Sequence, residues 1–166
     1  MKTVLILRHA KATLPTGRLG PPDFNQPLSE QGREDATRIG KLLRQGGLVP
    51  DLVVGSAALR ARETAELVIA ESGYEGEVQV TEELYLAPLN KYVAYLSELP
   101  NEVERVLVVG HNPGLEELIY QLTGSDKTLP TAALAELALP IESWAELSAD
   151  GRGRLENFCL PQDVED

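Results

Sequence analysis

The sequence has few of the features that mark disulfide-stapled, zinc-clustered or membrane-spanning proteins. It contains one cysteine, Cys159, which excludes an intramolecular disulfide and a cysteine-cluster zinc site. No apolar run approaches the ~20 residues that cross a bilayer. The apolar stretch at residues 3–7 is too short for the core of a signal peptide. We therefore expect a soluble cytoplasmic protein without a membrane partner.

Basic residues are in the minority and are unevenly distributed. The net charge of −11 argues against a nucleic-acid partner. Of the 15 Lys and Arg residues, 10 lie in residues 1–62, where only 5 of the 26 Asp and Glu residues are found. This local excess fits either an anion site or ordinary solvated helix faces, and charge alone favours the second interpretation.

The length and the apolar pattern indicate an α/β fold. A chain of 166 residues buries roughly two-thirds of the surface that it exposes when unfolded, enough for a core without metals or disulfides. Short apolar runs predict strands over 3–7, 52–54, 78–80, 105–109 and 132–139. Helical spacing predicts helices over 29–45, 56–73, 89–99 and 112–123, with Ser29 and Ser56 as the first two caps. This alternation predicts a three-layer αβα sandwich with a mostly parallel, mixed central sheet and helices on both faces.

Two segments depart from this alternation. Residues 12–28 hold four prolines and two glycines, so we expect a long loop, a feature that is usually functional or mobile. Residues 143–147 and 154–158 flank Asp150-Gly151 and are expected to pair as a hairpin at an antiparallel edge of the sheet. No second domain is expected within residues 1–166.

Unusual polar residues follow three of the predicted strands. The first strand ends in Arg8-His9, the second leads into a helix that carries Arg60 and Arg62, and the third ends in Gly110-His111. In open α/β sheets, ligands bind beyond the carboxyl ends of the strands. One histidine after a strand is more often a satisfied core residue than a catalyst. Because both histidines of the chain lie at such positions, a functional site is as well supported as a structural role.

These residue types suit an anion, and phosphate above all. Arginine presents a planar fork that binds phosphate oxygens bidentately, and the helix that begins near Asn112 offers backbone N–H groups. Histidine can act as a nucleophile or as a donor near neutral pH. The sequence contains no P-loop, no Gly-x-Gly-x-x-Gly fingerprint and no aspartate-rich metal cluster. Metal-free phosphoryl transfer through histidine, without a cofactor, is the reaction that these residues favour.

Four motifs, in order along nearly the whole chain, resemble the histidine phosphatase superfamily, and most closely its small SixA-type phosphohistidine phosphatase branch. They are LILRHAKA at 5–12, PLSEQGREDA at 27–36, SAALRARETAELV at 56–68 and VLVVGHNPGLEELI at 106–119, with a weaker match in LPTAALAEL at 129–137. Together these motifs are highly specific, although each alone is weak. The resemblance implies the phosphoglycerate mutase-like fold.

The resemblance also implies roles for individual residues. His9 is the expected nucleophile that forms a phosphohistidine, and Arg8 and Arg60 are the expected phosphate-binding arginines. His111 is the expected second histidine of the phosphate pocket, with Asn112 supplying a backbone N–H group nearby. The register of the motif selects Arg60, so Arg62, two residues on, is expected to be a solvated helix residue.

The sequence departs from the family pattern at several positions. Ala10 replaces the glycine of the Arg-His-Gly motif, and Ala57 stands where proline is common. Many members also place a glutamate in the pocket as a proton donor, and Glu82 and Glu83 fall in the corresponding interval. Glu83 is the candidate, and a solvated surface pair is an equally good interpretation. A phosphoramidate needs a strong acid less than an alkyl phosphate does, because imidazole is a good leaving group.

The expected activity is a metal-independent phosphatase that acts through a phosphohistidine intermediate. The interval 67–105 has no room for the cap that covers the pocket in other members, so a phosphorylated protein, with phosphohistidine as the reacting group, is the preferred substrate. Small phosphorylated metabolites are an open alternative. A mutase would need a cap and an obvious acid, and a non-catalytic phosphate-binding module would be expected to lack one of the two histidines.

Overall fold

The computed structural model describes residues 1–13, 22–148 and 150–164, so most of the predicted loop 12–28, residues 14–21, lies outside the described part. The described strands form one six-stranded sheet in the order β3-β2-β4-β1-β5-β6. Their bounds are β1 Lys2–Arg8, β2 Leu52–Ser56, β3 Val78–Thr81, β4 Arg105–Gly110, β5 Leu134–Leu139 and β6 Arg154–Cys159. Strands β1 to β4 are parallel, whereas β5 and β6 are antiparallel to their neighbours. The sheet is therefore mixed, as predicted.

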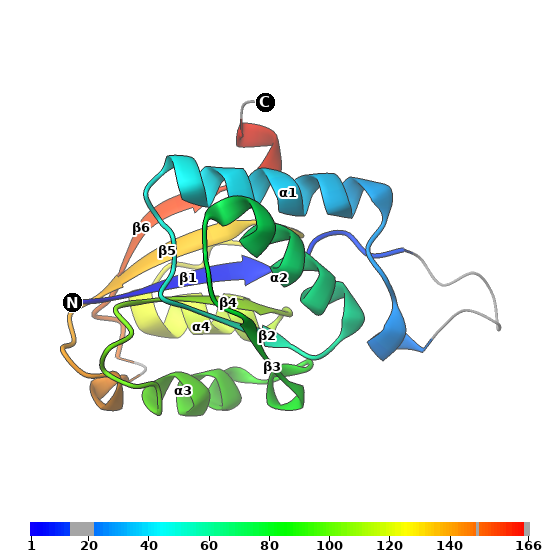
Figure 1. Cartoon of the computed structure of the whole chain (residues 1–166). Coiled ribbons are helices and arrows are strands. Elements are labelled where there is room, and N and C mark those ends of the chain that lie inside the picture. Colours follow the sequence, from blue (N-terminus) through cyan, green and yellow to red (C-terminus); the bar gives the residue numbers. More distant parts are fainter. Residues whose placement is uncertain (14–21, 149, 165–166) are drawn as a thin grey trace.

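Helices cover both faces of this sheet (Figure 1). On one face lie α1, Glu30–Gln45, and α2, Leu59–Ser72; on the other lie α3, Leu89–Ser97, and α4, Gly114–Thr123. The predicted three-layer αβα sandwich is confirmed. In Figure 1, β1 points toward the side on which the short helical turn Asp23–Asn25 lies, so the carboxyl ends of the parallel strands face that turn.

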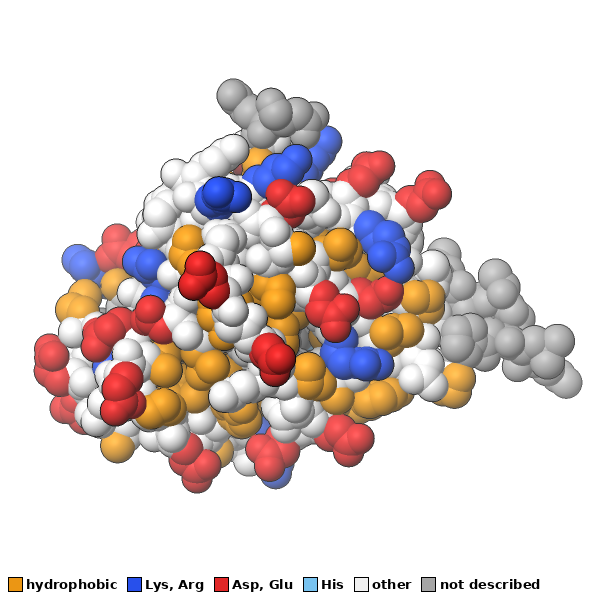
Figure 2. Space-filling view, viewed as in Figure 1, with side chains coloured by type: hydrophobic (Ala, Val, Ile, Leu, Met, Phe, Trp, Pro, Cys, Tyr) orange, Lys and Arg blue, Asp and Glu red, His pale blue; other side chains and the backbone are white. Residues whose placement is uncertain are grey.

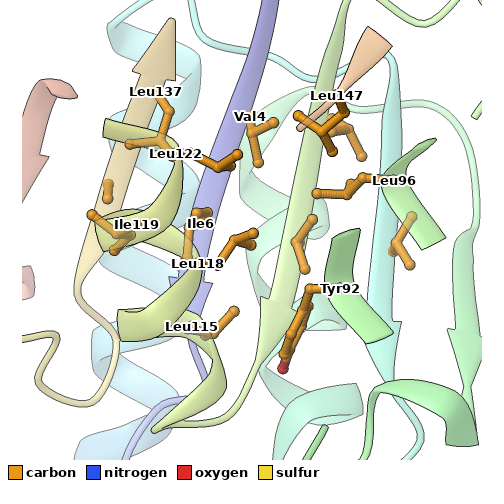
Figure 3. Packing of buried hydrophobic residues seen from close by; sticks show 14 of the residues in the cluster. Val4, Ile6, Tyr92, Leu96, Leu115, Leu118, Ile119, Leu122, Leu137 and Leu147 are labelled. Atoms are coloured by element: carbon orange, nitrogen blue, oxygen red, sulfur yellow. The ribbon is translucent and has the colours of Figure 1, made fainter. Parts of the chain in front are cut away.

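Alternate residues of the central strand β1 pack into two separate hydrophobic cores, one on each face of the sheet. Leu5 and Leu7 of β1 face α1 and α2, whereas Val4 and Ile6 face α3 and α4. Figure 3 shows the second core, in which α4 lays one apolar face across the sheet. Each fully buried aliphatic side chain of this kind contributes on the order of 1.5–3 kcal/mol to folding. Both faces of β1 are buried, which explains why it appears in the sequence as a continuous apolar run.

Helix α1 follows its sequence pattern closely. The Ser29 hydroxyl accepts the backbone N–H of Gly32 at 3.1 Å, the predicted cap, which is worth about 1 kcal/mol. Ala36, Ile39 and Leu43 are buried on the face predicted from their spacing. A cap of this strength and an uninterrupted apolar face explain why the boundaries of this helix could be predicted.

The predicted C-terminal hairpin is wrong. Residues 143–147 form a 3₁₀ turn, Trp144–Glu146, instead of a strand, and β6 pairs with β5. Local chemistry explains the difference, because Ser143 and Glu146 form a reciprocal capping box. The Trp144 side chain is fully buried, and its indole N–H donates to the Val103 carbonyl oxygen at 2.8 Å. This turn therefore covers the end of the sheet.

Three boundaries also differ from the sequence prediction. Ser56 is the last residue of β2, and α2 begins only at Leu59, so Ser56 is not the helix cap. Its hydroxyl accepts the Ala58 N–H at 3.2 Å. Helix α4 begins at Gly114, after the cis Asn112–Pro113 peptide, and β5 begins at Leu134. The residues that were predicted to be helix or strand but lie outside these elements are found at the carboxyl ends of the parallel strands.

The distribution of charge on the surface reflects the uneven distribution of basic and acidic residues along the sequence. Several basic side chains lie over α1 in Figure 2, whereas acidic side chains are spread over the lower part of that face. Arg33, Lys41 and Arg44 of α1 are exposed, while Arg60 is buried. The basic excess of residues 1–62 therefore serves both a solvated helix and a buried position. None of the helices in the described part of the chain has the length and apolar character needed to cross a membrane.

Candidate active site

The two histidines lie side by side at the carboxyl ends of neighbouring parallel strands. Strands β1 and β4 pair in register up to Arg8 and Gly110, so the next residues, His9 and His111, come together with ring centroids 5.2 Å apart. The His9 N–H donates to the Gly110 carbonyl oxygen at 3.0 Å, which continues the ladder by one residue. Strand register thus brings together residues that are 102 positions apart in the sequence.

Arg60 contacts both histidine rings. It is in the first turn of α2, and only 6% of its surface is exposed. Its Nε–H donates to Nε2 of His9 at 3.3 Å, and its Nη2 group lies 3.5 Å from Nδ1 of His111. A guanidinium has donors and no acceptor, so both ring nitrogens that face Arg60 act as acceptors.

His9 is held as a neutral ring with a defined tautomer. Its Nδ1 lies 2.8 Å from the Ala10 carbonyl oxygen, an acceptor, so Nδ1 carries the proton and Nε2 carries the lone pair. Burial, opposed by the Ala10 hydrogen bond and assisted by the charge of Arg60, lowers the pKa of His9 to about 4. The ring nitrogen that faces Arg60 is therefore unprotonated near neutral pH.

His111 has the opposite tautomer. Its Nε2 lies 2.7 Å from the Ser56 hydroxyl oxygen, and since Nδ1 accepts from Arg60, Nε2–H is the donor. The His111 backbone N–H donates to the buried Tyr92 hydroxyl at 3.2 Å. Burial, followed by the neighbouring His9 and Arg60, lowers the pKa of His111 to about 3. Ser56, expected to be a helix cap, instead orients this histidine.

Arg8 and Asn112 converge on one backbone carbonyl. The Leu129 oxygen accepts from Nη1 of Arg8 at 3.2 Å and from Nδ2 of Asn112 at 2.8 Å, while the Leu129 N–H donates to Glu116 at 2.7 Å. Burial lowers the pKa of Arg8, against the raising effect of Glu116, and nearby Arg60 lowers it further. The buried Nε of Arg8 and Oδ1 of Asn112 have no hydrogen-bond partner within the described residues. The Nε–H of Arg8 is therefore a buried donor without a protein partner among the described residues.

Asp23 and Tyr85 complete the surroundings of Arg60. Nη1 of Arg60 donates to the Asp23 carbonyl oxygen at 2.7 Å, and Nη2 lies 3.1 Å from the Asp23 carboxylate. The Tyr85 hydroxyl donates to that carboxylate, and its ring stacks edge-on with His111 at 5.6 Å between centroids. The hydrogen bond from Tyr85, and then that from Arg60, lowers the pKa of Asp23. In this structure the backbone carbonyl oxygen and the carboxylate of Asp23 together occupy the two Nη groups of Arg60.

Arg62 and the candidate proton donor Glu83 lie outside this group. The partly buried Arg62 donates from Nε to the Ala57 carbonyl oxygen at 2.9 Å, so it is anchored on α2 and is not purely solvated. Glu83 is exposed in the turn Glu82–Leu84, and its charge helps to raise the pKa of Tyr95 after burial of that ring. Glu83 is not among the charges that affect either histidine.

Sequence reasoning missed Asp23, Tyr85 and Tyr92. Asp23 lies in the proline-rich segment that was expected to be functional, but nothing in the sequence specifies that its carboxylate turns toward α2. Tyr85 follows the Glu82–Leu84 turn, and its direction is set by its edge-on packing on Phe24, with ring centroids 5.0 Å apart. These contacts depend on tertiary structure and leave no periodic pattern.

Comparison with known proteins assigns the family. Residues 4–85 match the sequence model of the histidine phosphatase superfamily, branch 1. The solved structure of a SixA protein from Agrobacterium tumefaciens is 30% identical and superposes with a TM-score of 0.81, covering 96% of this chain and 98% of that one. The chain belongs to the histidine phosphatase superfamily.

Further similarities place the chain in the SixA-type branch of this superfamily. The protein histidine phosphatase SixA, solved in complex with tungstate, is 26% identical with a TM-score of 0.81, covering 97% of this chain and 98% of that one. An uncharacterised chloroplastic protein of Arabidopsis thaliana is 30% identical over 96% of this chain and 78% of its own length. Membership of this histidine phosphatase branch supports phosphatase activity.

Proposed function

We propose that this histidine phosphatase hydrolyses phosphohistidine in another protein by transferring the phosphoryl group to His9. The observation that carries the proposal is the contact between Nε2 of His9 and the Arg60 guanidinium, beside His111. A neutral imidazole lone pair next to a buried cation is the arrangement needed to attack a phosphoryl group while its oxygens are held.

Arg60, Arg8 and His111 are the proposed phosphate ligands. A phosphoryl group that displaces both the carbonyl oxygen and the carboxylate of Asp23 from Arg60 would take over a preformed fork of donors. The unpaired, buried Nε–H of Arg8 supports a second charged contact. His111 would add a third charged contact if it takes up a proton from solvent, because the negative charge of the arriving dianion raises the pKa of the ring. These cations would stabilise the equatorial oxygens of the transition state.

The reaction is proposed to need no metal ion, because the arginines supply the positive charge. In the first step the bond from phosphorus to the leaving atom breaks as the bond to Nε2 of His9 forms. In the second step water attacks the phosphohistidine and releases phosphate, which restores neutral His9. The Nδ1–H bond to the Ala10 carbonyl oxygen stabilises the ring while it carries the phosphoryl group.

Access to the site supports a protein substrate. We propose that residues 1–166 are a single histidine phosphatase domain without a cap insertion. Only the turn Glu82–Leu84 and α3 lie between β3 and β4 in the described structure. A pocket without a cap leaves room for a phosphorylated side chain on a large partner. That one similar SixA structure is named a protein histidine phosphatase adds support for this substrate class.

A side-by-side substrate screen tests the proposal. The purified protein is incubated with a phosphohistidine-carrying protein domain and with a panel of small phosphorylated metabolites, each with and without EDTA. We expect release of phosphate from the phosphohistidine protein at the higher kcat/KM, unaffected by EDTA. Preference for a metabolite would refute the substrate class, and inactivity in EDTA that is restored by magnesium would refute the metal-independent mechanism.

A further inference from the structure

The carboxylate of Asp23 is the one acidic group in contact with the buried guanidinium in the described structure. Asp23 Oδ2 lies 3.1 Å from Nη2 of Arg60, and the same Nη2 lies 3.5 Å from Nδ1 of His111. The Asp23 charge acts on both histidines, raising the pKa of each against the effect of burial. Asp23 therefore belongs to the same cluster as the proposed nucleophile.

Asp23 lies on the solvent side of that cluster. Its side chain is 60% exposed, whereas the side chain of Arg60 is 8% exposed. In-line displacement requires the leaving group to depart on the side opposite the nucleophile. His9 and Arg60 are both buried, so a leaving group that departs opposite Nε2 of His9 would leave toward solvent. The outward direction is the one in which Asp23 lies.

From this geometry we propose that Asp23 is a catalytic proton-transfer residue of the active site. The inference rests on the proposed phosphatase activity. When the phosphoryl group takes the guanidinium fork, the Asp23 carboxyl is released toward the leaving atom and stays tethered by Tyr85. It donates a proton to the leaving oxygen or nitrogen as the bond to phosphorus breaks. Asp23 acquires this first proton from solvent when the phosphoryl dianion binds beside it. It then takes a proton from the water that attacks the phosphohistidine, and loses that proton to solvent when phosphate leaves and the Arg60 contact re-forms.

Electrostatics is consistent with this change of role. In the ligand-free structure the hydrogen bonds from Tyr85 and Arg60 keep the pKa of Asp23 low. A phosphoryl dianion replaces the Arg60 contact and adds negative charge beside the carboxyl, and both changes raise its pKa. Tyr85, whose own pKa is raised by its hydrogen bond to Asp23, stays protonated and can hold the carboxyl in place. The exposed Glu83 has no comparable contact with this cluster.

The dependence of kcat/KM on the leaving group distinguishes proton transfer by Asp23 from mere competition of Asp23 with the phosphoryl group for Arg60. The experiment measures kcat/KM of wild type, Asp23→Asn and Asp23→Ala on 4-nitrophenyl phosphate, whose phenolate leaves without help, and on an alkyl phosphate, whose alkoxide needs a proton. We expect Asp23→Asn to lose on the order of 10²–10⁴-fold on the alkyl phosphate and less than about tenfold on the aryl phosphate. It should also release nitrophenol in a burst, because water attack on the phosphohistidine is slowed.

One control variant and three contrary results make the experiment decisive. Glu66→Gln is the control, because it removes an exposed carboxylate on the same helix as Arg60. Its kcat/KM should equal that of wild type on both substrates. An equal change on both substrates, or a gain in kcat/KM, would mean that Asp23 only competes for Arg60 and would overturn the inference. A leaving-group-selective loss in Glu83→Gln instead would assign the role to Glu83. A wild-type protein that releases phosphate neither from these two substrates nor from the phosphohistidine protein would refute the proposed function itself.

Discussion

Nε of Arg60 lies 3.3 Å from Nε2 of His9, the unprotonated ring nitrogen of that residue. The contact links the proposed nucleophile directly to the proposed phosphate-binding cation. It also opposes protonation of His9, because a proton on Nε2 would face a positive guanidinium. The same arginine that would hold the phosphoryl group therefore keeps the nucleophile neutral.

The protonation states can be checked directly, because the chain has only two histidines. We expect the ring ¹⁵N and ¹H resonances of both to stay those of neutral imidazoles from pH 8 down to pH 5, since their pKa values lie at about 4 and about 3. The spectra should show the Nδ1–H tautomer for His9 and the Nε2–H tautomer for His111. Titration of either ring near pH 6.5 would contradict the burial that the structure assigns to it.

Stability should depend on pH through the same groups. The unfolded histidines take up protons near pH 6.5, whereas the folded ones do so near pH 4 and pH 3, so between pH 6.5 and pH 5 the unfolded state binds more protons. The free energy of unfolding should therefore fall as the pH is lowered, by up to about 1.4 kcal/mol per pH unit for each histidine. Urea titrations of wild type and of the His9→Gln/His111→Gln variant measure this slope. An equal slope in both proteins would assign the effect to other groups.

Arg60 and Arg62 are a matched pair on one helix. Arg60→Ala removes a charge-assisted contact to the phosphoryl group, worth about 1.5–3 kcal/mol, so kcat/KM should fall about 10- to 150-fold. Arg62→Ala removes only the bond to the Ala57 carbonyl oxygen, so kcat/KM should change by less than about threefold. Steady-state assays of both variants on one substrate decide between them. The reverse order of effects would require a different register for the start of α2.

Tyr92 is expected to support His111 through the backbone. Its hydroxyl accepts the His111 N–H at 3.2 Å inside the core, and burial raises its pKa to about 12. Tyr92→Phe leaves that buried N–H unpaired and should lower the free energy of unfolding by about 1–3 kcal/mol. Tyr95→Phe is the control, because the Tyr95 hydroxyl bonds to Gln79 at the surface. Equal losses in the two variants would contradict a specific role for the Tyr92 hydroxyl.

Much of the fold could be predicted because its strongest signals are local. Strands β1 and β4 are buried on both faces, so each appears as a short continuous apolar run, and Ser29 marks the start of α1. The segment at Trp144 was wrongly predicted to be a strand because Asp150-Gly151 indicated a hairpin turn between residues 143–147 and 154–158. The Ser143 capping box and the burial of the indole outweighed that pattern.

The part of the site that could be predicted from the sequence is the part whose positions are set by the ends of strands. His9 and His111 meet because β1 and β4 are parallel neighbours, which follows from the fold class. The contacts of Asp23 and Tyr85 with Arg60 and His111 depend on side-chain directions in two loops that are far apart in the sequence. The contact between Ser56 and His111 was missed for a related reason, because a serine before a helix is usually its cap.

Identification of the phosphorylated residue tests the proposed mechanism most directly. Wild type is mixed with a ³²P-labelled substrate, quenched within milliseconds under alkaline conditions that preserve phosphohistidine, and digested for peptide mapping. We expect acid-labile label on His9, and His9→Ala should show neither label nor turnover while still binding vanadate. Label on His111, or more than a trace of turnover in His9→Ala, would contradict the assignment of His9 as the nucleophile.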